Sequence, residues 1–182
     1  MKYNKNDMLT KMLKEAKFEN ISEISKIAKA SFEETYSPLT KDQEKYLNNS
    51  YSEEIIEGWI LNPRMIVTIS EKEKIVGFSV LVLPGGKLES DEVSKRQGEV
   101  GKLYILREYK RCGIGRLFLE KMECDCKTHN IKKLYLGVYH GNVNAIAFYK
   151  VVGFKESSKP IMFTRNSRYI MNMKLYKKIK YI

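Results

Sequence analysis

The chain has no apolar run close to the roughly 20 residues that a membrane-spanning helix requires. Its first residues are rich in Lys and Asn and lack the apolar segment of a secretory signal. It has three cysteines, an odd number without metal-ligand spacing, which argues against a disulfide-stapled secreted domain. We therefore expect a cytoplasmic protein that does not bind a membrane, with Cys124 and Cys126 as structural thiols of a helix.

Histidine is also scarce. His129 and His140 are the only two, and neither has the second histidine or acidic partner that would mark a metal site. No Ser/His/Asp arrangement can be argued from the spacing. His140 falls in the loop that leaves a predicted strand, so we do not favour it as a catalytic base. The sequence thus predicts no metal cofactor.

The net charge of +11 on 182 residues is the strongest bias in the composition. A basic surface suits nucleic acids, acidic membranes or polyanionic ligands. The lysines, however, are spread along the chain rather than massed in one tail or on one helix face. Nucleic-acid binding is therefore the minor alternative among the possible functions.

The apolar periodicity predicts mixed helices and strands in a single domain of residues 1–182, with residues 1–9 as a candidate disordered start. Helices are expected from Asn20, where Glu23 would complete a capping box, at 53–61, at 116–127 and after Asn142. Strands are expected at 10–16, 65–70, 74–83, 100–106, 134–138 and 169–175. This order argues for an α/β (α+β) domain with a twisted, largely antiparallel central sheet.

The segment Lys110-Arg111-Cys112-Gly113-Ile114-Gly115-Arg116 follows a predicted strand and opens a predicted helix. Its two glycines allow a turn in which successive backbone N–H groups point into one concavity. The first turn of the helix adds free N–H groups and the positive end of its dipole, and phosphate is the usual anion at such a site. The three cationic side chains favour the same ligand, so we interpret the segment as a cradle for a pyrophosphate.

Two other phosphate-binding motifs are excluded. A dinucleotide-binding loop needs a third glycine at the position where this chain has Phe118, and no P-loop motif exists in the chain. A glycine-rich turn that merely joins a strand to a helix remains the structural alternative for this segment alone.

A second informative segment extends from Leu136 to Phe154. The short apolar run from Leu134 to Val138 predicts a buried strand. Asn142 or Asn144 can cap the helix that follows, and Gly153 has the position of a helix C-terminal glycine. This second strand–loop–helix unit argues against a purely structural role for the first.

Together, the two segments resemble the GNAT superfamily of acetyl-CoA-dependent N-acetyltransferases. The family loop, Gln/Arg-x-x-Gly-x-Gly/Ala, is matched by Lys110, Gly113 and Gly115, with lysine in place of Gln or Arg. The later signature, Asn-x-x-Ala-x-x-Phe/Leu-Tyr-x-x-x-Gly-Phe, is matched at Asn142, Ala145, Phe148, Tyr149, Gly153 and Phe154. The resemblance covers most of the chain and implies a sheet splayed between its fourth and fifth strands, with the cofactor in the split. Coenzyme A is polyanionic, which would account for part of the net charge.

The resemblance also implies which residues hold acetyl-CoA. The backbone amide of Leu103 would polarise the thioester carbonyl, and Ile105 would pair with the pantetheine arm. The implied cofactor-binding residues are Leu103, Tyr104, Ile105, Lys110, Arg111, Cys112, Gly113, Ile114, Gly115, Arg116, Asn142, Ala145 and Tyr149.

Two residues are implied for proton transfer. Tyr149 would lie near the sulfur, where a phenol, with a pKa of about 10, can protonate or hydrogen-bond the leaving thiolate. Glu99 matches a position where some family members place a catalytic glutamate, and it would take a proton from the substrate ammonium. The structural alternatives are a tyrosine packed under the sheet and a solvated carboxylate at a strand end.

The segments at 32–36 and 136–149 look most like those of PaiA-type polyamine N-acetyltransferases, which implies spermidine, spermine or a related amine as the acceptor. Glu33, Glu34 and Tyr36, at the end of the first long helix, are the candidate substrate-binding residues. A protein N-terminus or lysine side chain is the leading competitor, and an antibiotic amine is a third. A homodimer is compatible with the sequence, which fixes no oligomeric state.

Overall fold

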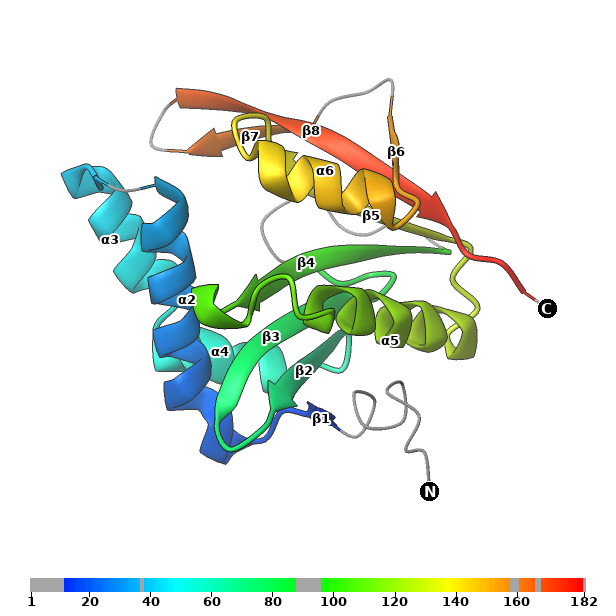
Figure 1. Cartoon of the computed structure of the whole chain (residues 1–182), viewed down its shortest axis with the longest axis horizontal. Coiled ribbons are helices and arrows are strands. Elements are labelled where there is room, and N and C mark those ends of the chain that lie inside the picture. The colour runs from blue at the N-terminus through cyan, green and yellow to red at the C-terminus, as the bar shows by residue number, and fades with distance from the viewer. Residues whose placement is uncertain (1–11, 37, 88–95, 158–160, 166–167, 182) are drawn as a thin grey trace. The chain divides into compact units, whose positions relative to one another are not determined.

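The computed structural model describes residues 12–36, 38–87, 96–157, 161–165 and 168–181 (Figure 1). The chain divides into two compact units. The first contains residues up to 80 and 102–121, and the second contains 81–101 and 122 onward. The candidate disordered start at residues 1–9 lies outside the described residues, and the single domain stays a prediction.

The first unit combines helices with one part of the sheet. Its elements are β1 (Leu13–Glu15), η1 (Phe18–Asn20), α2 (Ile21–Tyr36), α3 (Lys41–Ser50), α4 (Glu53–Leu61), β2 (Met65–Glu71), most of β3 (Ile75–Val82), the end of β4 (Gln97–Ile105), η2 (Arg107–Tyr109) and the first half of α5 (Ile114–Thr128). β1 pairs antiparallel with β2, with Leu13 opposite Ser70.

Helix α2 forms because apolar and small residues recur on one of its faces. The buried residues are Ile24, Ser25, Ile27, Ala28, Ser31 and Phe32. The helix begins one residue after the predicted Asn20, but the predicted capping box is wrong. Asn20 Oδ1 accepts the backbone N–H of Lys17 at 2.8 Å, and Glu23 forms an ion pair with Lys26.

Helix α3 was missing from the predicted elements because it is polar and buries only Leu47. Its signal is a capping box, a motif in which two side chains satisfy backbone N–H groups reciprocally. The Thr40 hydroxyl accepts from the Gln43 N–H at 3.3 Å, and Gln43 Oε1 accepts from the Thr40 N–H at 2.9 Å. Helix α4, by contrast, has the predicted bounds and is capped by Ser52.

Strand β3 is buried along its whole length. It lies beside β2, as the predicted hairpin requires, and β4 is its other neighbour. A Cβ atom at Gly77 would lie 2.7 Å from the Tyr104 carbonyl oxygen and 3.2 Å from Ile105 Cα. Glycine at this position therefore allows β3 to approach β4 closely.

The second unit contains the rest of the sheet. Its elements are the start of β4, the second half of α5, β5 (Lys133–Tyr139), α6 (Val143–Val151), β6 (Lys155–Glu156), β7 (Ile161–Arg165) and β8 (Arg168–Lys178). β5 pairs antiparallel with β8, from Lys133 opposite Lys178 to Tyr139 opposite Asn172. β6 and β7 also pair antiparallel with β8, and neither was predicted.

The strand order is β1-β2-β3-β4-β5-β8-β6, and β7 pairs with β8. β4 and β5 are parallel, and their register covers Gln97–Lys133, Gly98–Leu134 and Glu99–Tyr135, although both strands continue. Because β4 and β5 pair only over these positions, the two strands can diverge beyond them, as the expected splay requires. The predicted fold class is confirmed: a mixed, mostly antiparallel sheet flanked by helices. Of the helices that the structure describes, none is long and apolar enough to cross a membrane.

Candidate functional site

The predicted anion loop joins η2 to α5 in the first unit. Arg111 and Gly113 both have left-handed backbone conformations, with φ of 63° and 88°. Within α5, the Leu117 N–H donates to the Gly113 carbonyl at 3.2 Å, so the N–H groups of residues 114–116 belong to the first helical turn. Left-handed residues alternating with others, followed by a helix N-terminus, form the concave set of N–H donors that binds anions.

Several side chains of this loop reach the solvent. Lys110, Arg111, Cys112 and Arg116 are exposed. An added Cβ at Gly113 would meet no atom within 4 Å, so glycine is needed there for its positive φ and not for lack of space. The backbone N–H groups at the start of α5 and the cationic side chains beside them suit a pyrophosphate.

Lys110 and Glu34 are brought together by the fold. Lys110 Nζ donates to Glu34 Oε2 at 2.6 Å, and both side chains are partly exposed. Glu34 lies in the last turn of α2, next to the negative end of the helix dipole, where a carboxylate is disfavoured. The lysine therefore compensates a charge that the helix itself would repel.

The other two predicted substrate-binding residues lie close to Glu34 on α2. Glu33 is exposed, and Tyr36 is half-buried with its ring centroid 4.5 Å from that of Phe32. This end of α2 thus presents two carboxylates beside an aromatic surface. Such a surface can attract and contact a cationic amine.

The end of β4 is fixed by contacts on both faces. Leu103 and Ile105 pack against the core cluster of Val76, Ile114 and Phe118. Tyr104 points to the other face, where its hydroxyl lies 2.7 Å from that of Tyr51. The strand that the family resemblance assigns to the acetyl and pantetheine groups is therefore packed on both faces.

Sequence reasoning missed two residues on that second face. Tyr51 is buried, and the Lys102 side chain is buried with its Nζ 5.2 Å from the centre of the Tyr51 ring. The alternation of side chains along a strand places Lys102 on the same face as Tyr104, so this signal was present in the sequence.

In the second unit, Glu99 is only 5% exposed. β4 begins at Gln97, so Glu99 lies inside the strand, and the alternative of a solvated strand-end carboxylate is wrong. The Tyr135 hydroxyl donates to Glu99 Oε2 at 3.4 Å, and Lys174 Nζ lies 4.7 Å from the centre of the Tyr135 ring. A buried carboxylate with a hydroxyl donor can exchange a proton at a defined position.

Tyr149 lies on α6 and is 9% exposed. Its ring centroid is 5.2 Å from that of Phe148 and 5.5 Å from that of Phe154, so the ring is packed as the structural alternative requires. The predicted caps are confirmed: Asn142 Oδ1 accepts from the Ala145 N–H at 3.1 Å, and Gly153 has a φ of 95°. These caps fix both ends of the helix that carries Tyr149.

Among the described residues, the histidines and cysteines do not gather into a site of their own. His140 is exposed, with its ring centroid 4.6 Å from that of Tyr139. Cys112 and Cys124 are exposed and Cys126 is buried. Within the residues described, no three His, Cys, Asp or Glu side chains gather as a metal site would need.

An anion cradle at the start of a helix suits a cofactor that carries a pyrophosphate, as coenzyme A does. The chain matches the model of the Acetyltransferase (GNAT) family over residues 21–154, and it belongs to that family. It is an acetyltransferase, and the expected use of acetyl-CoA as acetyl donor is confirmed.

Individual relatives are distant. An uncharacterized N-acetyltransferase of Lactobacillus delbrueckii subsp. lactis is 23% identical over 152 residues, which cover 82% of this chain and 87% of that protein. An N-alpha-acetyltransferase of Sulfurisphaera tokodaii is 37% identical over 62 residues, 34% of this chain and 37% of that protein. The crystal structure of the PaiA N-acetyltransferase from Thermoplasma acidophilum in complex with coenzyme A has the same fold. Its TM-score is 0.74 at 21% identity, covering 91% of this chain and 97% of that one.

Proposed function

We propose that this acetyltransferase moves the acetyl group of acetyl-CoA to a primary amine of a polyamine such as spermidine or spermine. The amine would attack directly in a ternary complex. The observation that carries acetyl transfer is the anion cradle at the start of α5 in a chain of the GNAT family. The polyamine is supported by the resemblance to PaiA-type enzymes and by the carboxylates at the end of α2.

Two parts of the first unit would hold the cofactor. The N–H groups at the start of α5, with Arg111, Arg116 and Lys110, would bind the pyrophosphate. The backbone of residues 103–105 would hold the pantetheine and acetyl groups, because both faces of this strand are fixed by packing. When bound, acetyl-CoA supplies an activated acetyl thioester.

Two residues of the second unit are proposed for proton transfer. An alkylammonium has a pKa near 10.4 and must lose a proton before it can attack. Glu99, buried beside the Tyr135 hydroxyl, would accept that proton at a carboxylate oxygen. Tyr149 would donate its phenol proton, or a hydrogen bond, to the leaving thiolate. Asn142 and Ala145 would contribute by fixing the start of α6.

A polycationic substrate must approach a protein of net charge +11. Screening limits the effect of distant charges to roughly 8–10 Å, so local carboxylates can dominate. Glu33 is exposed and would supply the stronger local attraction, whereas the charge of Glu34 is partly compensated by Lys110. Tyr36 would add an aromatic contact for the amine chain.

The test is thiol release from acetyl-CoA by the purified chain with spermidine, spermine, short diamines, lysine peptides, peptides with free N-termini and aminoglycosides. We expect turnover on spermidine or spermine, reduced at least tenfold by Tyr149→Phe and by Glu99→Gln. Tyr181→Phe is the matched control for the loss of a tyrosine hydroxyl. Turnover on peptide N-termini alone would instead favour the reaction of the Sulfurisphaera relative and reject the polyamine.

Cofactor binding can be measured separately by calorimetry. Gly113→Val should weaken acetyl-CoA binding at least tenfold, because a β-branched residue does not adopt the required positive φ. Gly58→Val is the control, since Gly58 is an exposed helix position with open space around it. Equal acetyl-CoA affinity in both variants would show that the loop does not bind the cofactor.

A further inference from the structure

Four lysines that are far apart in the sequence lie on one face of the sheet in the second unit. Lys133 and Lys178 are directly opposite each other across β5 and β8, and Lys174 lies further along β8 on the same side. Lys155 of β6 is opposite Tyr176. Because paired residues of neighbouring strands point to the same side, these residues share one surface. We call it the Lys/Tyr face: Lys133, Tyr135, Lys155, Lys174, Tyr176 and Lys178.

The other side of these strands is the one that carries the helices. Leu134, Leu136 and Leu175 are buried there. On that side Lys177 of β8 donates to Glu123 of α5 at 2.5 Å. Helix α6 lies against the same strands in Figure 1, and the Lys177 side chain lies beside its terminal Gly153. The Lys/Tyr face is therefore the side opposite to these helices.

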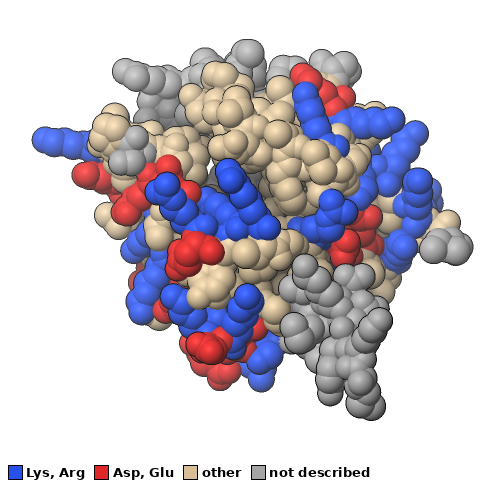
Figure 2. Space-filling model, in the orientation of Figure 1, with Lys and Arg blue, Asp and Glu red and all other residues tan. Residues whose placement is uncertain are grey.

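The lysines of the two sides have different partners. On the helix side, Lys177 is paired with a carboxylate, and so is Lys150 of α6, whose Nζ lies 3.9 Å from Glu156. On the Lys/Tyr face, Lys133 Nζ lies 4.2 Å from the centre of the Tyr176 ring, and Lys174 has the equivalent contact with Tyr135. Basic and acidic side chains are intermingled on the side of the molecule that Figure 2 draws. The one carboxylate that the described pairing places on this face, Glu99, is buried beside Tyr135.

This arrangement has an electrostatic cost. Like charges directly opposite each other on neighbouring strands are destabilising, and Lys133 and Lys178 are such a pair. A cation–π contact at a partly exposed site offsets only about 0.5–1 kcal/mol. A polyanion bound to the face would remove the repulsion and would match four cations with phosphate charges.

The tyrosines distinguish one polyanion from others. Stacking on an aromatic ring is how proteins bind the bases of single strands without sequence preference, while nearby lysines contact the phosphates. Tyr176 is half-buried and is flanked by Lys174 and Lys178 on its strand, with Lys155 opposite. An acidic protein would use the charge but not the rings. An anionic membrane would likewise use the lysines but would offer no base to stack on Tyr176.

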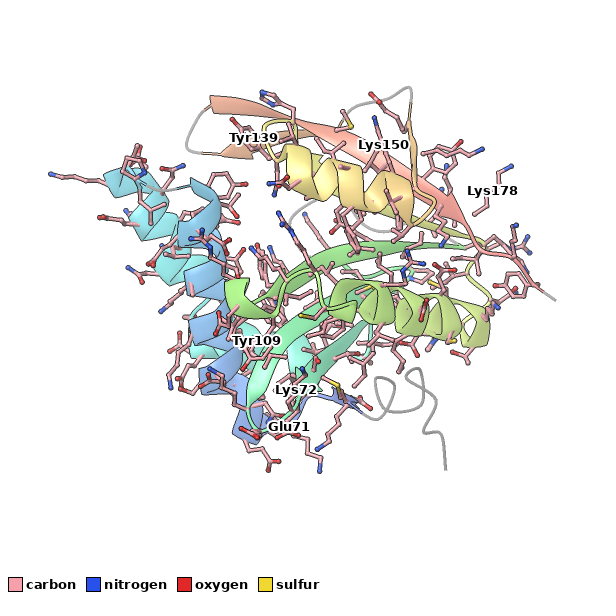
Figure 3. The ribbon with its side chains drawn as sticks, viewed as in Figure 1. Glu71, Lys72, Tyr109, Tyr139, Lys150 and Lys178 are labelled. Atoms are coloured by element: carbon pink, nitrogen blue, oxygen red, sulfur yellow. The ribbon has the colours of Figure 1, made fainter. Side chains whose placement is uncertain are left out.

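We propose that the Lys/Tyr face binds a single-stranded nucleic acid, with its lysines on the phosphates and Tyr176 under a base. This function goes beyond acetyl transfer, although Tyr135 of the face also donates to Glu99. It also assigns a role to the positive charge that the sequence scatters over positions 133 to 178. Figure 3 labels one lysine of each side: Lys178 of β8, which belongs to the Lys/Tyr face, and Lys150 of α6, which lies on the helix side.

The test is fluorescence anisotropy of a labelled oligouridylate with the full chain over a range of salt concentrations. If all four lysines contact phosphates, the slope of log K against log salt should be about −3, since each contact on a single strand contributes about 0.7. The double change Lys133→Gln with Lys178→Gln should weaken binding at least fivefold and reduce the slope by about 1.4. The double change Lys127→Gln with Lys150→Gln alters the net charge equally, at exposed positions on α5 and α6, and should change the affinity less than twofold.

A second variant separates nucleic acid from polyanions in general. Tyr176→Leu should weaken oligouridylate binding about fivefold or more while leaving the affinity for polyglutamate unchanged. If the variants in β5 and β8 fold poorly, Lys155→Gln tests the proposal instead, because Lys155 is exposed on the short strand β6. This variant should also weaken oligouridylate binding. The proposal is overturned by absence of binding, by equal effects of the two lysine pairs, or by polyglutamate competing as well as the oligonucleotide regardless of Tyr176.

Discussion

Lys110 Nζ and Glu34 Oε2 are 2.6 Å apart, and this contact joins the start of the anion loop to the last turn of α2. The two residues are 76 positions apart in the chain, so the ion pair is a tertiary contact. Because both side chains are partly exposed, its contribution to stability should be modest, about 0.2–1 kcal/mol. A double-mutant cycle with Lys110→Met and Glu34→Gln, read by urea denaturation, measures it. A coupling energy that does not decrease with added salt would contradict an electrostatic origin.

The same contact predicts unequal roles for two neighbouring carboxylates. Glu33→Gln should raise the KM for spermidine several-fold, because Glu33 is exposed and its charge is available. Glu34→Gln should raise it less, since Lys110 already compensates that charge. Each variant is the other's matched control, because both remove one charge from one helical turn. A larger effect at Glu34 would reverse the assignment.

Any side chain at position 77 would clash with the backbone of β4. In Gly77→Ala, the new methyl group would lie 2.7 Å from the Tyr104 carbonyl oxygen, and backbone atoms cannot move aside cheaply. We expect a loss of about 1–3 kcal/mol in the free energy of unfolding. Gly58→Ala, where nothing lies within 4 Å, should instead stabilise α4 by about 0.5–1 kcal/mol. Thermal denaturation of the two variants gives the comparison, and equal shifts would argue against a close β3–β4 contact.

Two asparagines at the start of α6 should differ in their contribution to stability, because only Asn142 is the N-cap. Asn142→Ala removes the acceptor for the Ala145 N–H and should cost about 1 kcal/mol. Asn144→Ala, at an exposed position of the same helix, should be neutral or slightly stabilising. Because α6 carries Tyr149, the Asn142 variant should also lose some activity. Denaturant midpoints of the two variants test whether Asn142→Ala destabilises the protein more than Asn144→Ala does.

Burial raises the pKa of the Cys126 thiol to about 12, with further increases from the charges of Asp125 and Glu123. Native protein should therefore react with a thiol reagent at Cys112 and Cys124 and not at Cys126, whereas denatured protein should react at all three. The pKa of a thiol in an unfolded chain is about 8.5, so unfolding above that pH releases a proton. The Cys126 contribution to stability is thus complete below about pH 8.5 and decreases as pH rises toward 12.

Urea midpoints at increasing alkaline pH test this direction. The decrease should be shallower in Cys126→Ala, which has no thiol to titrate. Rapid labelling of Cys126 in the native state would show that the residue is not buried as described.

Several features of the fold could be predicted because they depend on local sequence signals. The bounds of α4 follow from its apolar residues and from the Asn62-Pro63 stop, and Gly153 has the expected left-handed conformation. The loop at 110–116 is recognisable because its glycines, charges and following helix are contiguous. Such signals require no knowledge of distant contacts.

Other features depend on contacts that the sequence does not display. Helix α3 is stabilised by its capping box and buries one residue, so it has no apolar period to detect. The burial of Glu99 depends on β5, which pairs with β4 at Tyr135. Likewise, the lysines of the Lys/Tyr face come together only through the register of β5, β6 and β8. For that reason, a charge that looks dispersed along the chain can be concentrated in space.

The position of β8 has a consequence for synthesis of the protein. β8 follows β5, β6 and β7 along the chain, yet it lies between β5 and β6. While the ribosome is still adding residues 168–178, the β5 edge that β8 will cover has no partner there, and β6 has nothing to pair with. This edge of the sheet therefore cannot form until residues 168–178 have been synthesised. A polypeptide that stalls before residue 168 would expose an open strand edge, which is a recognised route to aggregation and a feature that chaperones and proteases can detect.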